Sequence, residues 1–266
     1  MKKIKQTLEK ALIEAGRVIK QAAEKPISIE YKSPVSLLTQ TDKKAERVVI
    51  DIIQKNFPDH AILSEESPPL GKSKSKWIID PIDGTTNFVH GLPGYCVSIG
   101  YEEDGVVQVG GVFNPILDEW FWAERGKGAS LNGKKIKVTK AKKLSESLLA
   151  TGFPYDRRER AKYYLKFVEE FMLRTHGLRR LGSSAIDLCY VACGRFDGYW
   201  EANIEAWDKA AGGLLVTEAG GKTSDYSGAP LTLKGRQNLA TNGLIHEAML
   251  KELIQHKFTG ITPVSK

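Results

Sequence analysis

The sequence predicts an α+β fold in its first half and an α/β fold in its second half. Two N-terminal stretches carry apolar residues at helical spacing, and short strand-like runs separated by turn residues follow, which is typical of an antiparallel sheet. Beyond about residue 144, strands and helices alternate, which favours an α/β arrangement. Because no clear linker interrupts the chain, we expect one compact unit with an N-terminal half over residues 1–143 and a C-terminal half over residues 144–266.

The N-terminal half is predicted to begin with two helices and to continue with strands. Apolar residues recur at helical spacing through residues 2–24 and again over residues 42–56, and Pro58 ends the second helix. A buried strand at residues 61–63 leads into a loop rich in Pro, Gly, Ser and Lys. The other elements expected in this half are strands at residues 77–79, 96–101, 106–113, 119–123 and 136–138, and a short helix at residues 86–90.

The C-terminal half is predicted to alternate between strands and helices. The expected strands cover residues 148–151, 178–181, 196–200 and 238–241. The expected helices cover residues 158–173, 184–192 and 208–219, with a final helix that ends near residue 256.

Composition excludes some classes of protein. The chain has 266 residues, of which 41% are hydrophobic and 27% charged, an ordinary balance for a soluble globular fold. No apolar run reaches the length of a membrane span, and the first 25 residues carry both signs of charge, unlike a signal peptide. We therefore expect a cytoplasmic protein with no membrane partner, in which Cys96, Cys189 and Cys193 stay reduced.

The formal net charge of +7 favours anionic partners. Basic residues concentrate at 72–76, 134–143 and 157–162, but none of these segments is interleaved with stacking aromatic residues. A solvated lysine-rich surface is the simpler interpretation, and a dedicated nucleic-acid face is the alternative.

The segment from Trp77 to Phe88 carries the strongest functional signal. Its apolar strand ends in two carboxylates, Asp80 and Asp83, which Pro81 separates and a Gly-Thr-Thr turn follows. Paired carboxylates suit a hard divalent cation, usually Mg²⁺, and the amide groups of a helix start suit a phosphate. This segment therefore predicts metal-assisted phosphate chemistry.

Two further acids, Glu65 and Asp208, occupy the same kind of position, at the end of a predicted strand or the start of a predicted helix. Four carboxylates at one sheet edge would repel one another unless cations lay between them. Simpler interpretations stay open for each residue alone: Asp208 as a helix N-cap, Glu65 as an exposed strand end and Asp83 as a turn residue.

These residues also carry a resemblance to a known family. Asp80-Pro-Ile-Asp-Gly-Thr-Thr-Asn-Phe88 resembles the first signature of the inositol monophosphatase family, and the run from Trp207 to Gly221 resembles its second. Ser64-Glu65-Glu66-Ser67 is similar to the family's upstream acidic element. The similarity covers nearly the whole chain and implies a layered αβαβα sandwich of the inositol monophosphatase and fructose-1,6-bisphosphatase type, as well as a homodimer.

The resemblance implies two Mg²⁺ ions in each subunit. One would be held by Glu65, Asp80 and the backbone carbonyl of Ile82, and the other by Asp80, Asp83 and Asp208. A third ion is left open, because the loop that often supplies its site matches the residues from 31 to 39 only loosely, with a serine at position 36 where family members often carry an acid.

Catalytic and binding roles follow from the same resemblance. Thr85 and Asp42 match the pair that orients the attacking water, with Glu65 as a third catalytic residue, although Thr85 and Asp42 can also be helix N-caps. Water activated by two metals would attack phosphorus without a phosphoenzyme. The residues expected to bind substrate are Asp83, Gly84, Thr85, Gly182, Ser183, Ser184, Glu201 and Asp208, and an exposed strand-end carboxylate is the alternative interpretation of Glu201.

The resulting hypothesis is a phosphatase for inositol 1-phosphate or a similar small polyol phosphate. The first alternative is a related phosphatase for fructose-1,6-bisphosphate, a 3′-phosphonucleotide, histidinol phosphate or NADP, because the motifs define the phosphate chemistry and not the leaving group. An alternative of another class is a binding partner in a nucleic-acid complex, although the complete acid set argues for an enzyme.

Overall fold

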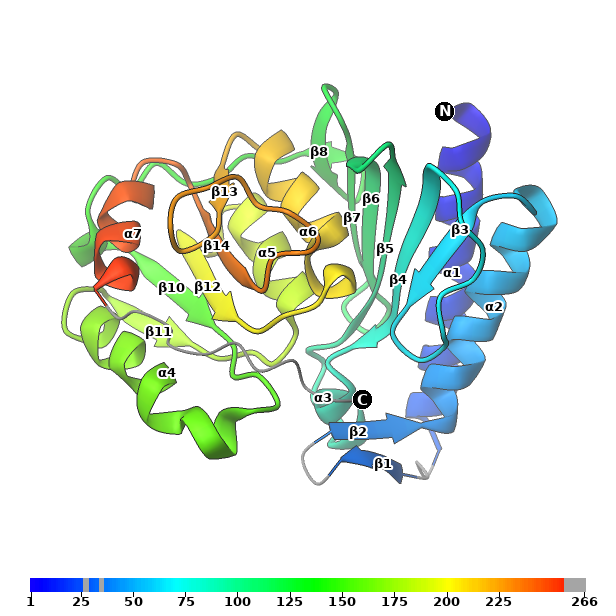
Figure 1. The fold of residues 1–266 in the computed structure, drawn as a ribbon, viewed down its shortest axis with the longest axis horizontal. Helices are drawn as coiled ribbons and strands as arrows, with labels where there is room; N and C mark the ends of the chain where they lie inside the picture. The colour runs from blue at the N-terminus through cyan, green and yellow to red at the C-terminus, as the bar shows by residue number, and fades with distance from the viewer. Residues whose placement is uncertain (26–28, 34–35, 256–266) are drawn as a thin grey trace.

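The structure, a computed structural model, describes residues 1–25, 29–33 and 36–255. Helices and sheets alternate in five layers, helix–sheet–helix–sheet–helix (Figure 1). The layered αβαβα sandwich predicted from the sequence is therefore confirmed. None of the helices in the described ranges combines the length and hydropathy that a membrane span requires.

The first two layers are a helix pair and a seven-stranded sheet. Helices α1 (Lys2–Ala23) and α2 (Gln40–Asn56) pack together and cover one face of the sheet, where Leu8, Leu12 and Ile53 are fully buried. The strand order is β3-β4-β5-β6-β7-β8-β9; β3 and β4 are parallel and all other neighbours are antiparallel. The strands are β3 (Ala61–Ser64), β4 (Ser75–Asp83), β5 (Cys96–Glu103), β6 (Val106–Asn114), β7 (Glu119–Glu124), β8 (Gly128–Leu131) and β9 (Lys134–Lys135).

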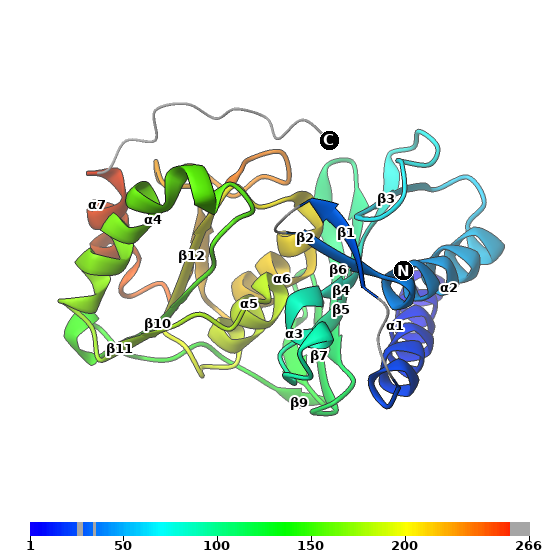
Figure 2. The ribbon, with the colours of Figure 1, turned by 90° about the horizontal axis from the view of Figure 1, so that it is seen from below.

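Helices α5 (Ser184–Ala192) and α6 (Ala206–Glu218) form the middle layer between the two sheets, as Figures 1 and 2 show. Helix α6 approaches the strands closely because small residues face one another. A Cβ atom on Gly110 of β6 would lie only 2.9 Å from the Cα of Ala211. The helix is thereby held with its first turn against β4, where Ala206 and Ala210 pack on Ile78.

The last two layers are a five-stranded mixed sheet and two outer helices, α4 (Arg157–Met172) and α7 (His246–Ile254). The strand order is β11-β10-β12-β14-β13, with β10 parallel to β11 and β12, and β14 antiparallel to β12 and β13. The strands are β10 (Leu148–Thr151), β11 (Gly177–Arg179), β12 (Gly198–Ala202), β13 (Lys222–Ser224) and β14 (Gln237–Thr241).

Three smaller elements complete the chain. Strands β1 (Ile29–Ser33) and β2 (Ser36–Thr39) form a hairpin whose second strand contacts the short helix α3 (Thr85–Val89), and the 3₁₀ turn η1 (Leu144–Glu146) precedes β10. The sequence pattern predicted neither this hairpin nor the strands β8, β9 and β13. Most predicted boundaries lie within two residues of the observed ones, and the expected end of the last helix near residue 256 falls outside the described residues.

The predicted strand over residues 136–138 is wrong. The backbone N–H of Ile136 donates to Ala129 O in β8 (3.0 Å), whereas that of Val138 donates to Ala219 O at the end of α6 (3.2 Å). Because donors two residues apart bond to different elements, this segment does not form a strand and instead crosses from the first sheet toward the second. The division of the chain at residue 143 stays a prediction.

Candidate active site

Three carboxylates meet where β4 ends and α6 begins. Asp80, Asp83 and Asp208 each place one oxygen within 4.8 Å of the other two, which brings together residues from the two halves of the chain. Asp80 and Asp83 are only 1% and 8% exposed. Such a set matches the oxygen ligands that a hard divalent cation prefers.

The electrostatics of this cluster favour a bound cation. Burial raises the pKa of Asp80 well above its usual range, and the negative charges of Glu65, Asp83 and Asp208 raise it further. Asp80 Oδ1 is buried without a hydrogen-bond partner among the described residues. A buried oxygen that lacks a proton donor costs free energy unless a positive charge faces it. The donor set therefore fits a divalent metal.

The other two acids of the cluster are shifted in the same direction. Burial raises the pKa of Asp208, and the charge of Asp83 adds to the effect. Burial also raises the pKa of Asp83 to about 7, although hydrogen bonds from Ser183 and Ala185 oppose the shift.

Local backbone geometry aims the two β4 acids. The register between β4 and β5 is irregular between Asp80 and Asp83, where Pro81 has no N–H to donate. Gly84, which follows Asp83, has φ of +95° and caps α3. A Cβ atom there would lie 2.7 Å from Gly94 O, so only glycine fits this turn.

Asp42 and Thr85 are in contact, as their expected pairing requires. Thr85 Oγ1 lies 3.1 Å from Asp42 Oδ1 and 3.0 Å from Ile82 O, and Asp42 is fully buried. The N-cap interpretation is wrong for both residues, because Thr39 caps α2 and Gly84 caps α3. Asp42 is instead the third helical residue, and its Oδ2 accepts from Thr39 N at 2.8 Å.

Asp208 has the same arrangement at the start of α6. The helix begins at Ala206 with Glu205 as its N-cap, so the interpretation of Asp208 as the cap is wrong. Its Oδ2 accepts from Glu205 N at 2.6 Å, and this hydrogen bond holds the carboxylate at the first turn. In both α2 and α6, therefore, an acid at the third helical position is held by the backbone N–H of the N-cap residue.

Glu65 lies outside the set of three but close enough to affect it. It follows β3, its N–H donates to Ile79 O (3.2 Å), and its side chain is partly buried, so it is not simply an exposed strand end. After burial, its charge is the largest contribution to the raised pKa of Asp80. Buried Glu46 of α2 holds the loop after Glu65, since its Oε1 accepts from the N–H groups of Glu66 and Ser67 at 3.0 and 3.1 Å.

The start of α5 is bonded directly to Asp83. Asp83 Oδ2 accepts from Ser183 Oγ and from Ala185 N, both at 2.6 Å, so Asp83 is more than a turn residue. Ser183 also caps α5, as its Oγ accepts from Ile186 N. The preceding Gly182 has φ of +89°. These bonds join the end of β4, which carries Asp83, to the start of α5.

Glu201 lies on the inner face of β12, next to the start of α5. It is 8% exposed, which corrects the interpretation of an exposed strand-end carboxylate. Its Oε2 accepts from Ser184 Oγ at 2.9 Å and from the hydroxyl of Tyr199. Burial raises the pKa of Glu201. A Cβ atom on Gly152 would lie 2.0 Å from Glu201 Oε2, so this carboxylate occupies space that only glycine leaves open.

The sequence pattern missed three residues that shape this part of the site: Glu46, Gly152 and Tyr199. Glu46 and Gly152 act through contacts with residues far along the chain, and none of the three lies in a motif. Tyr199 carried a usable signal, because it lies two residues before Glu201 and alternate residues of a strand share a face.

The structure also places the three cysteines and His90. Cys96 and Cys189 are buried free thiols, and Cys193, which caps the C-terminus of α5, takes part in no cluster of possible metal ligands within the described ranges. His90 is exposed after α3. The loop linked to a third metal includes residues 34–35, which lie outside the described residues, so that expectation stays open.

Comparison with known proteins gives a consistent result. The profile described as "Inositol monophosphatase family" matches residues 1–258. The chain is 46% identical over 249 residues to an inositol-1-monophosphatase of Synechocystis sp., covering 91% of this chain and 86% of the relative. It is 40% identical over 248 residues to the Nus factor SuhB of Escherichia coli, covering 92% of this chain and 93% of the relative. The solved structure of an inositol monophosphatase from Anabaena (Nostoc) sp. superposes with a TM-score of 0.86 at 44% identity, covering 95% of each chain.

Proposed function

The chain belongs to the inositol monophosphatase family, a family of metal-dependent phosphatases, and from this premise we propose that it is a Mg²⁺-dependent phosphomonoesterase for inositol 1-phosphate or a similar small polyol phosphate. One observation carries the proposal: Asp80, Asp83 and Asp208 converge, and a buried oxygen of Asp80 has no proton donor among the described residues. Buried carboxylates that lack proton donors need cations beside them.

In the proposed site, two Mg²⁺ ions would be held by carboxylates and one backbone carbonyl. Glu65, Asp80 and the carbonyl of Ile82 would hold one ion, and Asp80, Asp83 and Asp208 would hold the other. The chemistry expected from bound Mg²⁺ is acidification of nearby water and neutralisation of charge on the phosphoryl oxygens.

Asp42 and Thr85 are proposed to prepare the attacking water. When Thr85 donates its proton to Asp42 Oδ1, 3.1 Å away, the Thr85 oxygen is left as an acceptor for a water proton. Asp42 is held for this task because its other oxygen accepts from Thr39. The amides of Gly84 and Thr85, at the start of α3, are proposed to donate to phosphate oxygens.

The polyol would lie against the start of α5 and the end of β12. Glu201 and Ser184 offer a carboxylate and a hydroxyl there, at 2.9 Å from each other, and these groups can bond to the substrate's hydroxyls. Gly182 and Ser183 shape the turn that carries Ser184.

A phosphate-release panel with Mg²⁺ tests the proposal. Inositol 1-phosphate should be hydrolysed faster than each of four alternative substrates: fructose-1,6-bisphosphate, 3′-phosphoadenosine 5′-phosphate, histidinol phosphate and NADP. Asp80→Asn should abolish release from every substrate, while Asp51→Asn, an exposed acid on α2, should leave it unchanged. Turnover by Asp80→Asn comparable to the parent protein would contradict the metal assignment, and preference for another substrate would favour that alternative.

A homodimer in the cytoplasm completes the proposal, and sizing chromatography should give twice the mass of one chain. A role as a binding partner in a nucleic-acid complex is the alternative of another class. Its support is that some relatives are named Nus factor SuhB.

A further inference from the structure

All of the protein's excess positive charge lies in one short segment. Residues 125–143 contain eight lysine or arginine residues and no aspartate or glutamate. Outside this segment 31 basic residues face 32 acidic ones, so the rest of the chain is nearly neutral. A solvated lysine-rich surface spread over the molecule would not produce this distribution.

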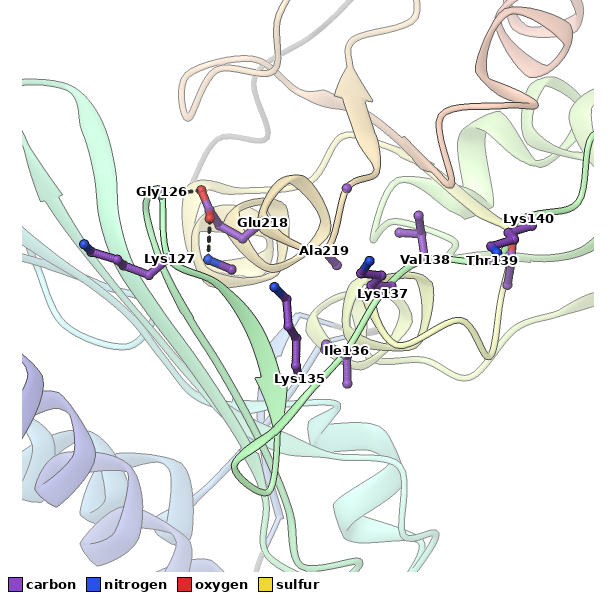
Figure 3. Close-up of a pocket in the computed structure, with 12 residues that line it drawn as sticks. Gly126, Lys127, Lys135, Ile136, Lys137, Val138, Thr139, Lys140, Glu218 and Ala219 are labelled. Carbon is purple, nitrogen blue, oxygen red and sulfur yellow. Dashed lines mark hydrogen bonds between the residues drawn. The ribbon is translucent and has the colours of Figure 1, made fainter.

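The segment folds around a groove of about 590 Å³ (Figure 3). The turn after β7, strand β9 and the crossing segment after it form most of the lining, and the end of α6 completes it. Four lysines belong to this lining, Lys127, Lys135, Lys137 and Lys140, and all four are exposed.

The acid in the lining, Glu218, is bonded to backbone amides and forms no ion pair with these lysines in the described part of the chain. Glu218 accepts from Gly126 N with Oε1 and from Gly128 N with Oε2, both at 2.8 Å. Both oxygens therefore fasten the β7–β8 turn to the end of α6. Within the described part of the chain, none of the four lining lysines forms an ion pair.

The arrangement of the ammonium groups indicates the shape of the partner. In Figure 3 the side chains of Lys127, Lys135, Lys137 and Lys140 are spread along the groove and do not converge on one point. A small anion would need converging donors, whereas a chain of regularly spaced charges fits a row. No aromatic side chain is among the described residues of the lining, so bases would have nothing to stack on.

The groove is separate from the candidate active site. Asp208 lies in the first turn of α6 and Glu218 is its last residue, which separates the two sites by about 15 Å at a rise of about 1.5 Å per residue. A ligand in the groove would therefore leave the carboxylate cluster open to a small substrate.

We propose that this groove binds the phosphate backbone of double-stranded nucleic acid, without reading its sequence. A duplex supplies closely spaced phosphates to a row of lysines and needs no stacking platform. The inference is independent of which phosphate ester the active site hydrolyses.

Binding of a short fluorescein-labelled RNA duplex tests the proposal, with Mg²⁺ and inorganic phosphate present to occupy the active site. We expect sequence-independent binding whose affinity falls with salt, with a logarithmic slope of about −3 for three to four phosphate contacts. Lys135→Glu combined with Lys137→Glu should weaken binding by about tenfold or more and reduce that slope, while phosphatase activity stays unchanged.

The matched control reverses the charge of two exposed lysines of α1, Lys10→Glu and Lys20→Glu. It changes the net charge by the same amount as the groove double variant. It should affect binding much less. Equal loss in both double variants would overturn the proposal, because net charge alone would then explain binding. Failure of the duplex to bind would also overturn it, as would equally tight and salt-sensitive binding of poly-glutamate, which would identify an acidic protein as the partner.

Discussion

Two acids of the candidate site, Asp42 and Asp208, each use one carboxylate oxygen to bond to a helix terminus. Asp42 and Asp208 each occupy the third position of a helix and bond to the backbone of its N-cap. In Asp42 the second oxygen is then left for Thr85. One residue type thus serves helix stability and the candidate chemistry together, so a capping role does not argue against a catalytic one.

Thr85→Val tests the division of labour at Asp42. The substitution keeps the shape of the side chain but removes the hydroxyl between Asp42 and Ile82. We expect kcat to fall by about a hundredfold or more, the range for losing a proton-transfer partner, with little change in KM. Thr86→Val, at the exposed neighbour on α3, is the control for the loss of a threonine. Equal activity of the two variants would show that Thr85 only supports α3.

Gly152→Ala tests how Glu201 is positioned. The new methyl group would lie 2.0–2.2 Å from the Glu201 carboxylate, which must then move. We expect KM for inositol 1-phosphate to rise about tenfold, or about 1.4 kcal/mol, while turnover of p-nitrophenyl phosphate changes little.

Gly177→Ala, on β11 beside the strand that Gly152 follows, is the control, because its Cβ would be no closer than 3.4 Å to a neighbour. If Gly152→Ala depressed turnover of both substrates equally, the substitution would be disturbing the fold and not polyol recognition.

At the scale of elements, the end of β14 and the start of α7 hold a buried histidine. His246 is fully buried, its Nδ1 lies 3.0 Å from Thr241 Oγ1, and its Nε2 lies 3.0 Å from Ser224 Oγ. Burial lowers its pKa to about 4 and Lys222 adds to the shift, although Glu247 opposes it. The folded protein therefore holds this ring neutral.

This histidine predicts how stability depends on pH. Below pH 6.5 the unfolded chain binds a proton at position 246 and the folded protein does not, until pH reaches about 4. The free energy of unfolding should therefore fall as pH is lowered through this window, by up to about 3 kcal/mol from His246. Urea titrations of His246→Gln should show a shallower pH dependence than the parent. His90→Gln, at an exposed position, should keep the parent slope, and a slope unchanged in His246→Gln would contradict the assignment.

Element packing also explains which strand predictions succeeded. Runs such as residues 96–101 and 148–151 are apolar and bounded by turns, and they form β5 and β10. Residues 136–138 carry the same signal, but their donors bond to β8 and to the end of α6. Strand identity at such a junction depends on partners that the local pattern does not specify.

At the scale of the whole molecule, the candidate active site joins the two halves of the chain. Asp80 and Asp83 come from the first sheet, whereas Asp208 and the start of α5 come from the middle layer. Without a cation, three neighbouring carboxylates work against this assembly, because the charges of Asp83 and Asp208 raise the pKa of Asp80 and that of Asp83 raises the pKa of Asp208.

Metal removal should therefore lower global stability. Addition of Mg²⁺ to EDTA-treated protein should raise Tm, with stabilisation of about 2.7 kcal/mol at a Mg²⁺ concentration one hundred times its Kd. Differential scanning calorimetry measures the shift, and K⁺ at equal ionic strength separates specific binding from screening. Asp80→Asn should remove most of the shift, and an unchanged shift in that variant would place the stabilising ion elsewhere.

The sequence by itself determined the kind of chemistry this protein can perform. Asp80 to Thr85 combine the acids, proline and glycine that suit a turn for binding a cation and a phosphate, because these preferences act within a few residues. Only the tertiary structure decided what the other residues do. The contact of Asp42 with Thr85, the bond from Ser183 to Asp83 and the space that Gly152 leaves for Glu201 each join residues at least 43 positions apart. Such contacts arise when layers pack, and local propensity holds no information about which distant side chain will lie opposite.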